Sequence, residues 1–406
     1  MKAVMYGAGN IGRGFIAQKF YLSGYDTTFI DVDLAVVNAI NEAHEYPIYV
    51  TGKGGYDKQY VKNVSAVDGR DVDAVVDTIA ECDIIATALG ANIIKFVAPN
   101  IAKAIVKRYE NGAKPLNILI CENLIGSNVI MHDYVAEYIP EHCKEYLENS
   151  IGFVCVCVGR TVPKAPEEFT KDNMLAVCTE PYSKLPADSE GFRPVGCEYP
   201  PIKGLVPFTP FKFFIEQKLL MHNMSHAMSA YLGYLKGYDK IPDVEVDAEI
   251  KYLITRAILE SARALSKKHG ASLDDNLEFF EALIIRFENK LLDDTMLRVG
   301  KDTKRKLSAS DRLGGAFKIV REQGMVPAHI AVGIAAGFLF DHPEDPIALE
   351  TSSYARDNGI AAALEKYCDI TDAADVEMVG RFYDMLKNKA SFAELCETLS
   401  DYKYRD

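Results

Sequence analysis

The chain has 406 residues, of which 49% are hydrophobic and 25% charged, which is long enough for two globular domains. Its formal net charge of −13 argues against nucleic acid and anionic membranes as partners, although a local basic pocket can still receive an anionic substrate. The longest apolar run, 330–340, is about half the length of a membrane span, and the sequence opens without a signal peptide pattern. The nine cysteines form no CxxC pair, so we expect reduced thiols and a cytoplasmic protein.

The first 120 residues alternate between strand and helix patterns. Apolar runs predict strands at 3–6, 27–31, 83–88 and 117–121. Helical spacing predicts helices at 11–23 and 93–109. This alternation indicates an α/β fold with a doubly wound parallel sheet of Rossmann type.

Beyond residue 150 the pattern changes twice. Two apolar runs between proline-bearing loops predict additional strands at 153–158 and 174–179. After a group of prolines that ends at Pro210, helical spacing and cap signals dominate, at 211–235, 244–268, 275–288, 310–322, 328–340 and from 346 to 404. We therefore predict a nucleotide-binding domain with extra strands over 1–205 and a mainly helical substrate domain over 206–406.

The segment Gly7-Ala8-Gly9-Asn10-Ile11-Gly12 fits the dinucleotide-binding pattern G-x-G-x-x-G. Gly7 permits a tight turn after the strand, Gly9 lets the backbone approach a pyrophosphate, and Gly12 allows close packing of helix on strand. The N-terminus of the following helix offers free N–H groups and a positive dipole end to phosphates. A nucleotide-free turn of an α/β protein is the alternative interpretation.

Three residues outside the loop extend this prediction. Asp31 ends the second predicted strand, where an acid hydrogen-bonds the adenosine ribose hydroxyls and repels a 2′-phosphate, so NAD is favoured over NADP. Arg13 directly follows the loop and is a candidate phosphate contact. Gly90 follows the third predicted strand and would flank the cofactor, although an ordinary turn explains it as well.

Reduction of a carbonyl needs a proton donor, and 218–226 is the best candidate segment. At 100° per residue, Lys218, Asn223 and His226 share one broad face of a helix that is otherwise rich in apolar residues. Loss of hydration lowers the pKa of a lysine, which would let it act as both acid and base. An amphipathic helix with a solvated lysine is the alternative interpretation.

Asn123 follows the strand predicted at 117–121, at the edge of the sheet where open α/β folds bind ligands. A turn-forming asparagine is the alternative. No set of cysteines and histidines has zinc-ligand spacing, so we expect no metal.

Lys218-x₄-Asn223-x₂-His226, with the glycine loop and further stretches such as Arg298-Val299-Gly300, resembles the mannitol dehydrogenase family of polyol-specific long-chain dehydrogenases along nearly the whole chain. The resemblance implies that Lys218 is the general acid/base, Asn123 and Asn223 form an oxyanion hole, and His226 contacts a substrate hydroxyl. Gly159 stands where the family usually has aspartate, which leaves the polyol contacts open. The family resemblance and the acidic surface favour a monomer.

A dense basic cluster suits a phosphorylated substrate, and Arg305 and Lys306 are its best candidates for phosphate contacts. A solvated charged surface is the alternative.

We expect NAD-dependent, metal-independent interconversion of D-mannitol 1-phosphate and D-fructose 6-phosphate. Alternatives are another polyol or hexuronate dehydrogenase that acts on an unphosphorylated substrate, and an NAD-binding sensor without catalysis.

Overall fold

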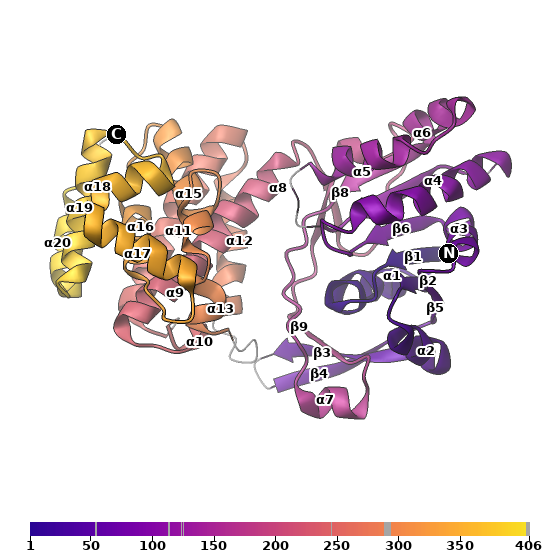
Figure 1. Cartoon of the computed structure of the whole chain (residues 1–406), viewed down its shortest axis with the longest axis horizontal. Helices are drawn as coiled ribbons and strands as arrows, with labels where there is room; N and C mark the ends of the chain where they lie inside the picture. Colours follow the sequence, from indigo (N-terminus) through magenta and orange to yellow (C-terminus); the bar gives the residue numbers. More distant parts are fainter. Residues whose placement is uncertain are drawn as a thin grey trace. The chain divides into compact units, whose positions relative to one another are not determined.

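The computed structural model describes residues 1–52, 55–112, 114–122, 124, 126–244, 246–287 and 294–402. It divides into two compact units, Met1–Lys212 and Phe213–Asp406, which are described separately below (Figure 1). The sequence placed the boundary between 205 and 206; in the structure the first unit continues to Lys212.

A six-stranded parallel sheet forms the centre of the first unit. Its strand order is β5-β2-β1-β6-β7-β8, which is the order of a Rossmann fold and confirms the predicted fold class. The strands are β1 (Lys2–Tyr6), β2 (Asp26–Asp31), β5 (Val64–Asp68), β6 (Ile84–Thr87), β7 (Leu116–Ile120) and β8 (Ile151–Cys155). All neighbouring pairs run parallel, so their carboxyl ends lie at one edge.

Helices cover both faces of this sheet, which explains the continuous apolar runs of its strands. On one face Met5 packs with side chains of η1 (Gly12–Ile16), α1 (Ala17–Leu22) and α2 (Leu34–Ala43). On the other face Val4 packs with α3 (Val72–Glu81), α4 (Ile94–Glu110) and α5 (Ser127–Ala136). The shorter helices η2 (Glu141–Cys143) and α6 (Lys144–Ser150) lead into β8.

Smaller strands extend the first unit. β3 (Glu45–Gly52) pairs antiparallel with β4 (Gly55–Lys62) and parallel with β9 (Val177–Thr179), while β10 (Leu185–Asp188) pairs with β11 (Leu205–Phe208). The short helices α7 (Glu167–Asp172) and η3 (Ser189–Gly191) lie in the connections. The sequence predicted β8 and β9 but not β3, β4 or β5.

The second unit is helical in its described part, apart from one isolated bridge between Lys240 and Thr295. Its helices are α8 (which begins at the boundary, Lys212–Gln217), η4 (Lys218–Asn223), α9 (Met224–Lys236), α10 (Ile241–Val244), α11 (Ala248–His269), α12 (Leu273–Phe287), α13 (Met296–Gly300), α14 (Thr303–Leu307), α15 (Arg312–Glu322), α16 (Ala328–Leu339), α17 (Pro346–Asn358), α18 (Ile360–Ala363), η6 (Leu364–Cys368), α19 (Ala373–Lys387) and α20 (Phe392–Ser400).

The buried helix α16 forms the core of this second unit. It packs against α9, α11, α15 and α19, and its side chains from Ala328 to Phe338 are buried on all sides. Aspartates cap several surrounding helices, among them Asp247 at α11 and Asp311 at α15. Within the described residues no helix is both long and apolar enough to cross a membrane.

Candidate active site

The glycine loop lies between β1 and η1, at the carboxyl edge of the parallel sheet. Gly7 has φ of +106°, and a Cβ there would approach the Ala88 carbonyl oxygen to 2.6 Å, so no other residue fits this turn. A Cβ on Gly12 would overlap the Gly7 carbonyl oxygen. The first helical hydrogen bond runs from Arg13 N to Gly9 O (3.0 Å), so the helix begins within the loop, at Asn10 and Ile11.

Gly9 differs from the other two glycines of the loop because the space that a side chain would occupy is open. A Cβ there would meet no described protein atom within 4 Å, and no left-handed φ requires glycine at this position. Packing within the protein therefore does not explain this glycine. Open space beside a helix N-terminus is what a dinucleotide pyrophosphate needs, so the loop fits that group.

Asp31 ends β2 and its carboxylate braces the loop. Oδ2 accepts a hydrogen bond from Ala8 N (2.6 Å), and Oδ1 accepts one from Asp33 N (3.0 Å). Each carboxylate oxygen has a second lone pair, so both can still accept from a ribose hydroxyl. Exposed Val32 and Leu34, at 63% and 45%, add apolar surface beside this acid.

Arg13 points into the protein. The residue is 8% exposed, and its guanidinium donates to the carbonyl oxygens of Ala8 and Leu175. These hydrogen bonds fix the glycine loop from the protein interior. Because the guanidinium is used in this way, the geometry does not support the phosphate contact that the sequence suggested for Arg13.

The turn after β6 is tied to the end of β7 by Glu122, which sequence analysis did not single out. This buried carboxylate accepts hydrogen bonds from Thr87 Oγ1 (2.7 Å) and Leu89 N (3.0 Å). Gly90 follows with φ of +92°, so the predicted flanking glycine does need its conformational freedom. Asn123, the predicted amide donor, lies outside the described residues.

In the second unit, α8, η4 and α9 form one continuous helix whose middle section is a π-helical turn. Met224 N donates to Leu219 O, five residues earlier. Residues five apart therefore lie one turn apart, which brings Lys218 and Asn223 to the same side of the helix. His226 lies three residues beyond Asn223, at a spacing where side chains are neighbours. All three are half-buried, and π-turns of this kind are frequent at functional sites.

His226 contacts a buried acid that the sequence did not reveal. Its Nε2 lies 3.0 Å from Asp294 Oδ2, and Asp294 also pairs with Arg298. Burial, with the nearby cations Arg298 and Lys306, lowers the pKa of His226 to about 3. The imidazole is therefore neutral at pH 7, and Nε2 donates to the Asp294 carboxylate.

Arg305 and Lys306 are separated by the fold. Arg305 is exposed and forms ion pairs with Asp302 (2.6 Å) and Asp311 (2.9 Å). Lys306 is 4% exposed and donates to the Val299 carbonyl oxygen. Burial, reinforced by Arg312, lowers the pKa of Lys306 to about 7.

The pKa of His226 is lowered by several cations from other segments of the chain. Lys306, Arg312, Arg286 and Arg298 all lower its pKa, whereas Arg305 is not among the principal contributors. These electrostatic effects favour Lys306 and Arg312, together with Arg286 and Arg298, over Arg305 as cations near His226. The sequence included Arg312 in the basic cluster but preferred Arg305 and Lys306 for the phosphate, and it singled out Arg298 only as part of a stretch that resembles the family.

Gly159 stands where family members usually carry aspartate, and its surroundings explain the exchange. A Cβ there would lie 2.9 Å from Cε1 of Tyr182, so the tyrosine ring occupies the space of a side chain.

Among the described residues, no group of three or more histidines, cysteines or acids could hold a metal ion.

A parallel sheet in this order, with a glycine loop after its first strand, is a Rossmann-type dinucleotide-binding fold, here followed in the chain by a helical unit. The model of the mannitol dehydrogenase Rossmann domain matches residues 1–195, and that of the mannitol dehydrogenase C-terminal domain matches 211–399. The chain belongs to the mannitol dehydrogenase family, which confirms the resemblance found in the sequence.

Individual relatives agree with this assignment. A mannitol-1-phosphate 5-dehydrogenase of Thermoanaerobacter pseudethanolicus is 35% identical over 387 residues, which cover 95% of this chain and 98% of that protein. A substrate-free D-sorbitol dehydrogenase has a TM-score of 0.78 at 17% identity, over 97% of this chain and 94% of its own. The Pseudomonas fluorescens mannitol 2-dehydrogenase, in complex with NAD and D-mannitol, has a TM-score of 0.70 at 16% identity, over 98% and 94% of the two chains. At these identities the two structures establish the fold alone.

Proposed function

We propose that this chain is an NAD-dependent, metal-independent dehydrogenase that interconverts D-mannitol 1-phosphate and D-fructose 6-phosphate. The observation that carries the proposal is the π-turn, which brings Lys218 and Asn223 to one side of a helix beside His226. The relative that is 35% identical, a mannitol-1-phosphate 5-dehydrogenase, supports the choice of substrate.

For the cofactor, Gly9 and Asp31 are the residues that fit best. The open side of Gly9 leaves room for the pyrophosphate, and the Asp31 carboxylate is placed to accept from the ribose hydroxyls. The acidic segment Asp31-Val32-Asp33 has no cation to receive a 2′-phosphate, which favours NAD. When bound, NAD supplies the acceptor for hydride from the polyol carbon.

In the proposed reaction Lys218 takes the proton from the reacting hydroxyl during oxidation and returns it during reduction. The Asn223 amide donates a hydrogen bond to the oxygen as negative charge develops on it. His226, held by Asp294, contacts a neighbouring substrate hydroxyl. Asn123 stays a proposed second amide donor on the strength of the sequence alone.

Lys306 and Arg312 are the proposed partners of the substrate phosphate. Lys306 is buried and Arg312 is half-buried, and both are among the cations that lower the pKa of His226. A lysine whose pKa lies near 7 becomes charged when a phosphate dianion is bound beside it, so binding and protonation of Lys306 would be coupled.

The second candidate is a dehydrogenase for an unphosphorylated polyol or hexuronate. Gly159 keeps this candidate open, because the usual aspartate is absent and the Tyr182 ring lies where its Cβ would be. Oxidation of NADH measured with fructose 6-phosphate, fructose and a hexuronate distinguishes the two. Turnover with fructose 6-phosphate at a kcat/KM at least about a hundredfold above that of fructose is expected. Turnover with fructose or a hexuronate but not with the phosphate would overturn the substrate assignment.

A further inference from the structure

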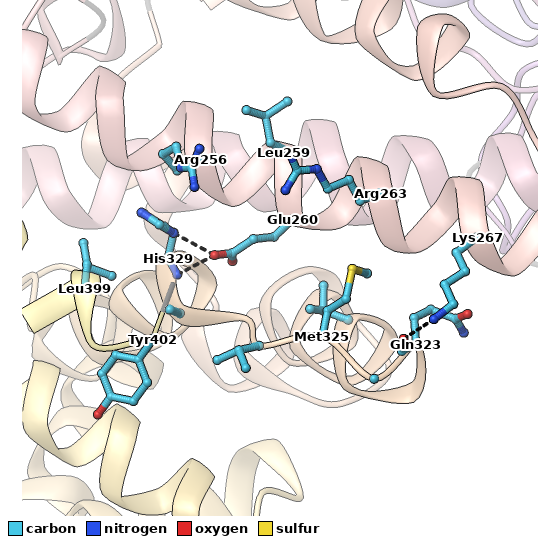
Figure 2. A pocket seen from close by; sticks show the side chains of 14 residues that line it. Arg256, Leu259, Glu260, Arg263, Lys267, Gln323, Met325, His329, Leu399 and Tyr402 are labelled. Atoms are coloured by element: carbon cyan, nitrogen blue, oxygen red, sulfur yellow. Dashed lines mark hydrogen bonds and ion pairs between the residues drawn. The ribbon is translucent and has the colours of Figure 1, made fainter. Parts of the chain in front are cut away.

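Two groups of polar side chains lie apart from the residues assigned above. The first lines a cavity of about 460 Å³ in the helical unit (Figure 2). There Glu260 accepts hydrogen bonds from His329 N (3.0 Å) and His329 Nδ1 (2.7 Å). Lys267 donates to the Gln323 carbonyl oxygen (2.7 Å). These contacts tie α11 to the end of α15 and the start of α16, so they stabilise the helical unit itself. The second group lies in the first unit, beside the helix that follows the glycine loop.

This helix contains a π-turn, η1 (Gly12–Ile16), close to its N-terminus. Ala17 N donates to the Gly12 carbonyl oxygen, five residues earlier, instead of following the α-helical pattern. π-turns are rare, and they are frequent at functional sites. Here the turn starts at the last glycine of the loop and directly follows residues 9–11, whose backbone N–H groups belong to the helix N-terminus that suits a pyrophosphate.

Two side chains from outside the helix bond the carbonyl oxygens of this π-turn. The Tyr46 hydroxyl, on β3, donates to the Arg13 carbonyl oxygen (2.8 Å). Nη1 of Arg160 donates to the Gly14 carbonyl oxygen (3.2 Å). Tyr46 has no exposed surface and Arg160 is 7% exposed, so both contacts are shielded from water. The position of the π-turn is therefore fixed by two separate segments of the chain.

Arg160 is itself held on several sides. Its Nε donates to the Tyr182 carbonyl oxygen, and Nη1 also donates to Gln18 Oε1, one turn further along the helix. The guanidinium carbon lies 4.5 Å from the centre of the Phe15 ring. Burial lowers the pKa of Arg160 to about 10, so the side chain is charged at pH 7. A buried cation with this set of contacts has one defined orientation.

The segment that carries Arg160 also packs directly on this helix. A Cβ on Gly14 would lie 2.6 Å from Val162 Cγ1, so only glycine permits this approach. Nδ2 of Asn10 lies 3.5 Å from the carbonyl oxygens of Val162 and Pro163. The segment therefore follows the helix from the glycine loop to the π-turn.

On the basis of the proposed dehydrogenase function, we infer that Arg160 and Tyr46 are positioning residues for NAD. They hold the π-turn from the protein interior, and the turn in its place orients the N–H groups of residues 9–11 toward the pyrophosphate. Both side chains act through the backbone of Arg13 and Gly14 and have no contact with the cofactor.

Titration of NADH fluorescence on the full chain tests this role without a sugar substrate. Arg160→Met removes the guanidinium and should raise the Kd for NADH at least about tenfold. Tyr46→Phe removes one hydroxyl and no charge, and it should raise this Kd by about threefold to tenfold. An unchanged Kd in Tyr46→Phe would overturn the positioning role, because any effect of Arg160→Met would then be one of charge alone.

Arg108→Met is the matched control. Arg108 is 4% exposed, and its guanidinium donates to the carbonyl oxygens of Cys82 (2.7 Å) and Lys114 (2.9 Å), next to the amino ends of β6 and β7. Arg108→Met and Arg160→Met should both lower the Tm, because each leaves buried carbonyl oxygens without a donor. Arg108→Met should nevertheless keep the Kd for NADH within about twofold. Equal weakening of NADH binding in both variants would mean a general loss of stability and would refute the inference.

Ligands with and without phosphate supply a readout that a merely structural role would not change. ADP-ribose has the pyrophosphate and adenosine lacks it, and each is used to displace NADH in the same titration. In Arg160→Met the Ki of ADP-ribose should rise by at least about tenfold, while that of adenosine should change less than about twofold. An equal rise for adenosine would contradict an effect on the pyrophosphate site.

If Arg160→Met does not fold, Tyr46→Phe decides the question with the same two ligands. A selective rise of the ADP-ribose Ki by about threefold to tenfold supports the inference, and an unchanged or unselective Ki refutes it. These titrations use no fructose 6-phosphate, so failure of the proposed substrate assignment is distinguishable from failure here.

Discussion

The glycine loop and the polar helix are built by different physical means. In the loop the shape of the main chain is decisive: Gly7 and Gly12 have no room for a Cβ, and one carboxylate, Asp31, braces the turn. On the helix charge is decisive: His226 is held by Asp294, and Lys306 and Arg312 act on it from other segments of the chain. The loop should therefore respond to added volume and the helix to changed charge or pH.

The largest effect is expected at Lys218. Lys218→Met should lower kcat for NADH oxidation with fructose 6-phosphate by about 10³-fold, since it removes the proposed acid/base, while NADH affinity changes less than twofold. Stopped-flow rates and NADH fluorescence titration measure the two quantities. Lys212→Met, at an exposed lysine of α8, is the control and should leave kcat within about twofold. A rate for Lys218→Met within tenfold of the unsubstituted enzyme would show that Lys218 is not the acid/base.

Asp294 tests whether the helix site depends on charge contributed from outside the helix. Asp294→Asn should lower kcat/KM by about 10–100-fold, because it weakens a buried hydrogen bond to His226 and leaves Arg298 without its partner. Steady-state kinetics with fructose 6-phosphate measure this loss. Asp341→Asn is the matched control, since Asp341 also accepts a hydrogen bond in this unit, from Tyr234. If both variants lose activity equally, Asp294 has no special role in holding His226.

Gly9 and Gly12 of the loop separate binding from folding. Gly9→Ala should keep the Tm within about 1 °C, because the added methyl meets no described protein atom, yet weaken NADH binding by about tenfold or more. Gly12→Ala should lower the Tm, since its Cβ overlaps the Gly7 carbonyl oxygen. Thermal unfolding measures the Tm of both variants, and NADH titration measures their affinity for the cofactor. Unchanged NADH affinity in Gly9→Ala would contradict approach of the pyrophosphate at this glycine.

These contrasts also explain what could be predicted from the sequence. The strands of the main sheet are buried on both faces, so β1, β2, β6 and β7 appear as short apolar runs. The loop could be predicted because glycine spacing encodes backbone geometry directly. β4 was missed because it is mostly exposed and polar, and its pairing with β3 leaves no apolar alternation of full length.

The helix site could be predicted only in part, for a different reason. Lys218, Asn223 and His226 are close in sequence, so their common face was predictable, but the prediction assumed 100° per residue and the π-turn changes that geometry. Asp294 and Arg312 reach His226 through tertiary packing, which no local pattern encodes. Arg305 and Lys306 are adjacent in one charged run, and the fold exposes the first and buries the second.

Lys306 offers the smallest and most specific test, a pH dependence confined to phosphorylated substrates. Its pKa is lowered to about 7 by burial and by the cations Arg312 and Arg305, while Asp302 and Asp311 act in the opposite direction. Below pH 7 Lys306 is therefore charged, and above it Lys306 loses the proton. A phosphate monoester is a dianion above about pH 6, so binding above pH 7 must restore that proton at a cost of up to tenfold in affinity per pH unit.

The KM for fructose 6-phosphate should accordingly be lowest near pH 6–7 and rise by about threefold to tenfold by pH 8. Lys306→Met should raise KM throughout and remove this rise, whereas Lys304→Met, at an exposed lysine of the same helix, should preserve it. Fructose has no phosphate that could couple with the protonation of Lys306, so the KM for fructose should show no comparable rise with pH. A rise of equal size with fructose, or one that persists in Lys306→Met, would assign the titration to another group and leave Arg312 as the remaining candidate for the phosphate.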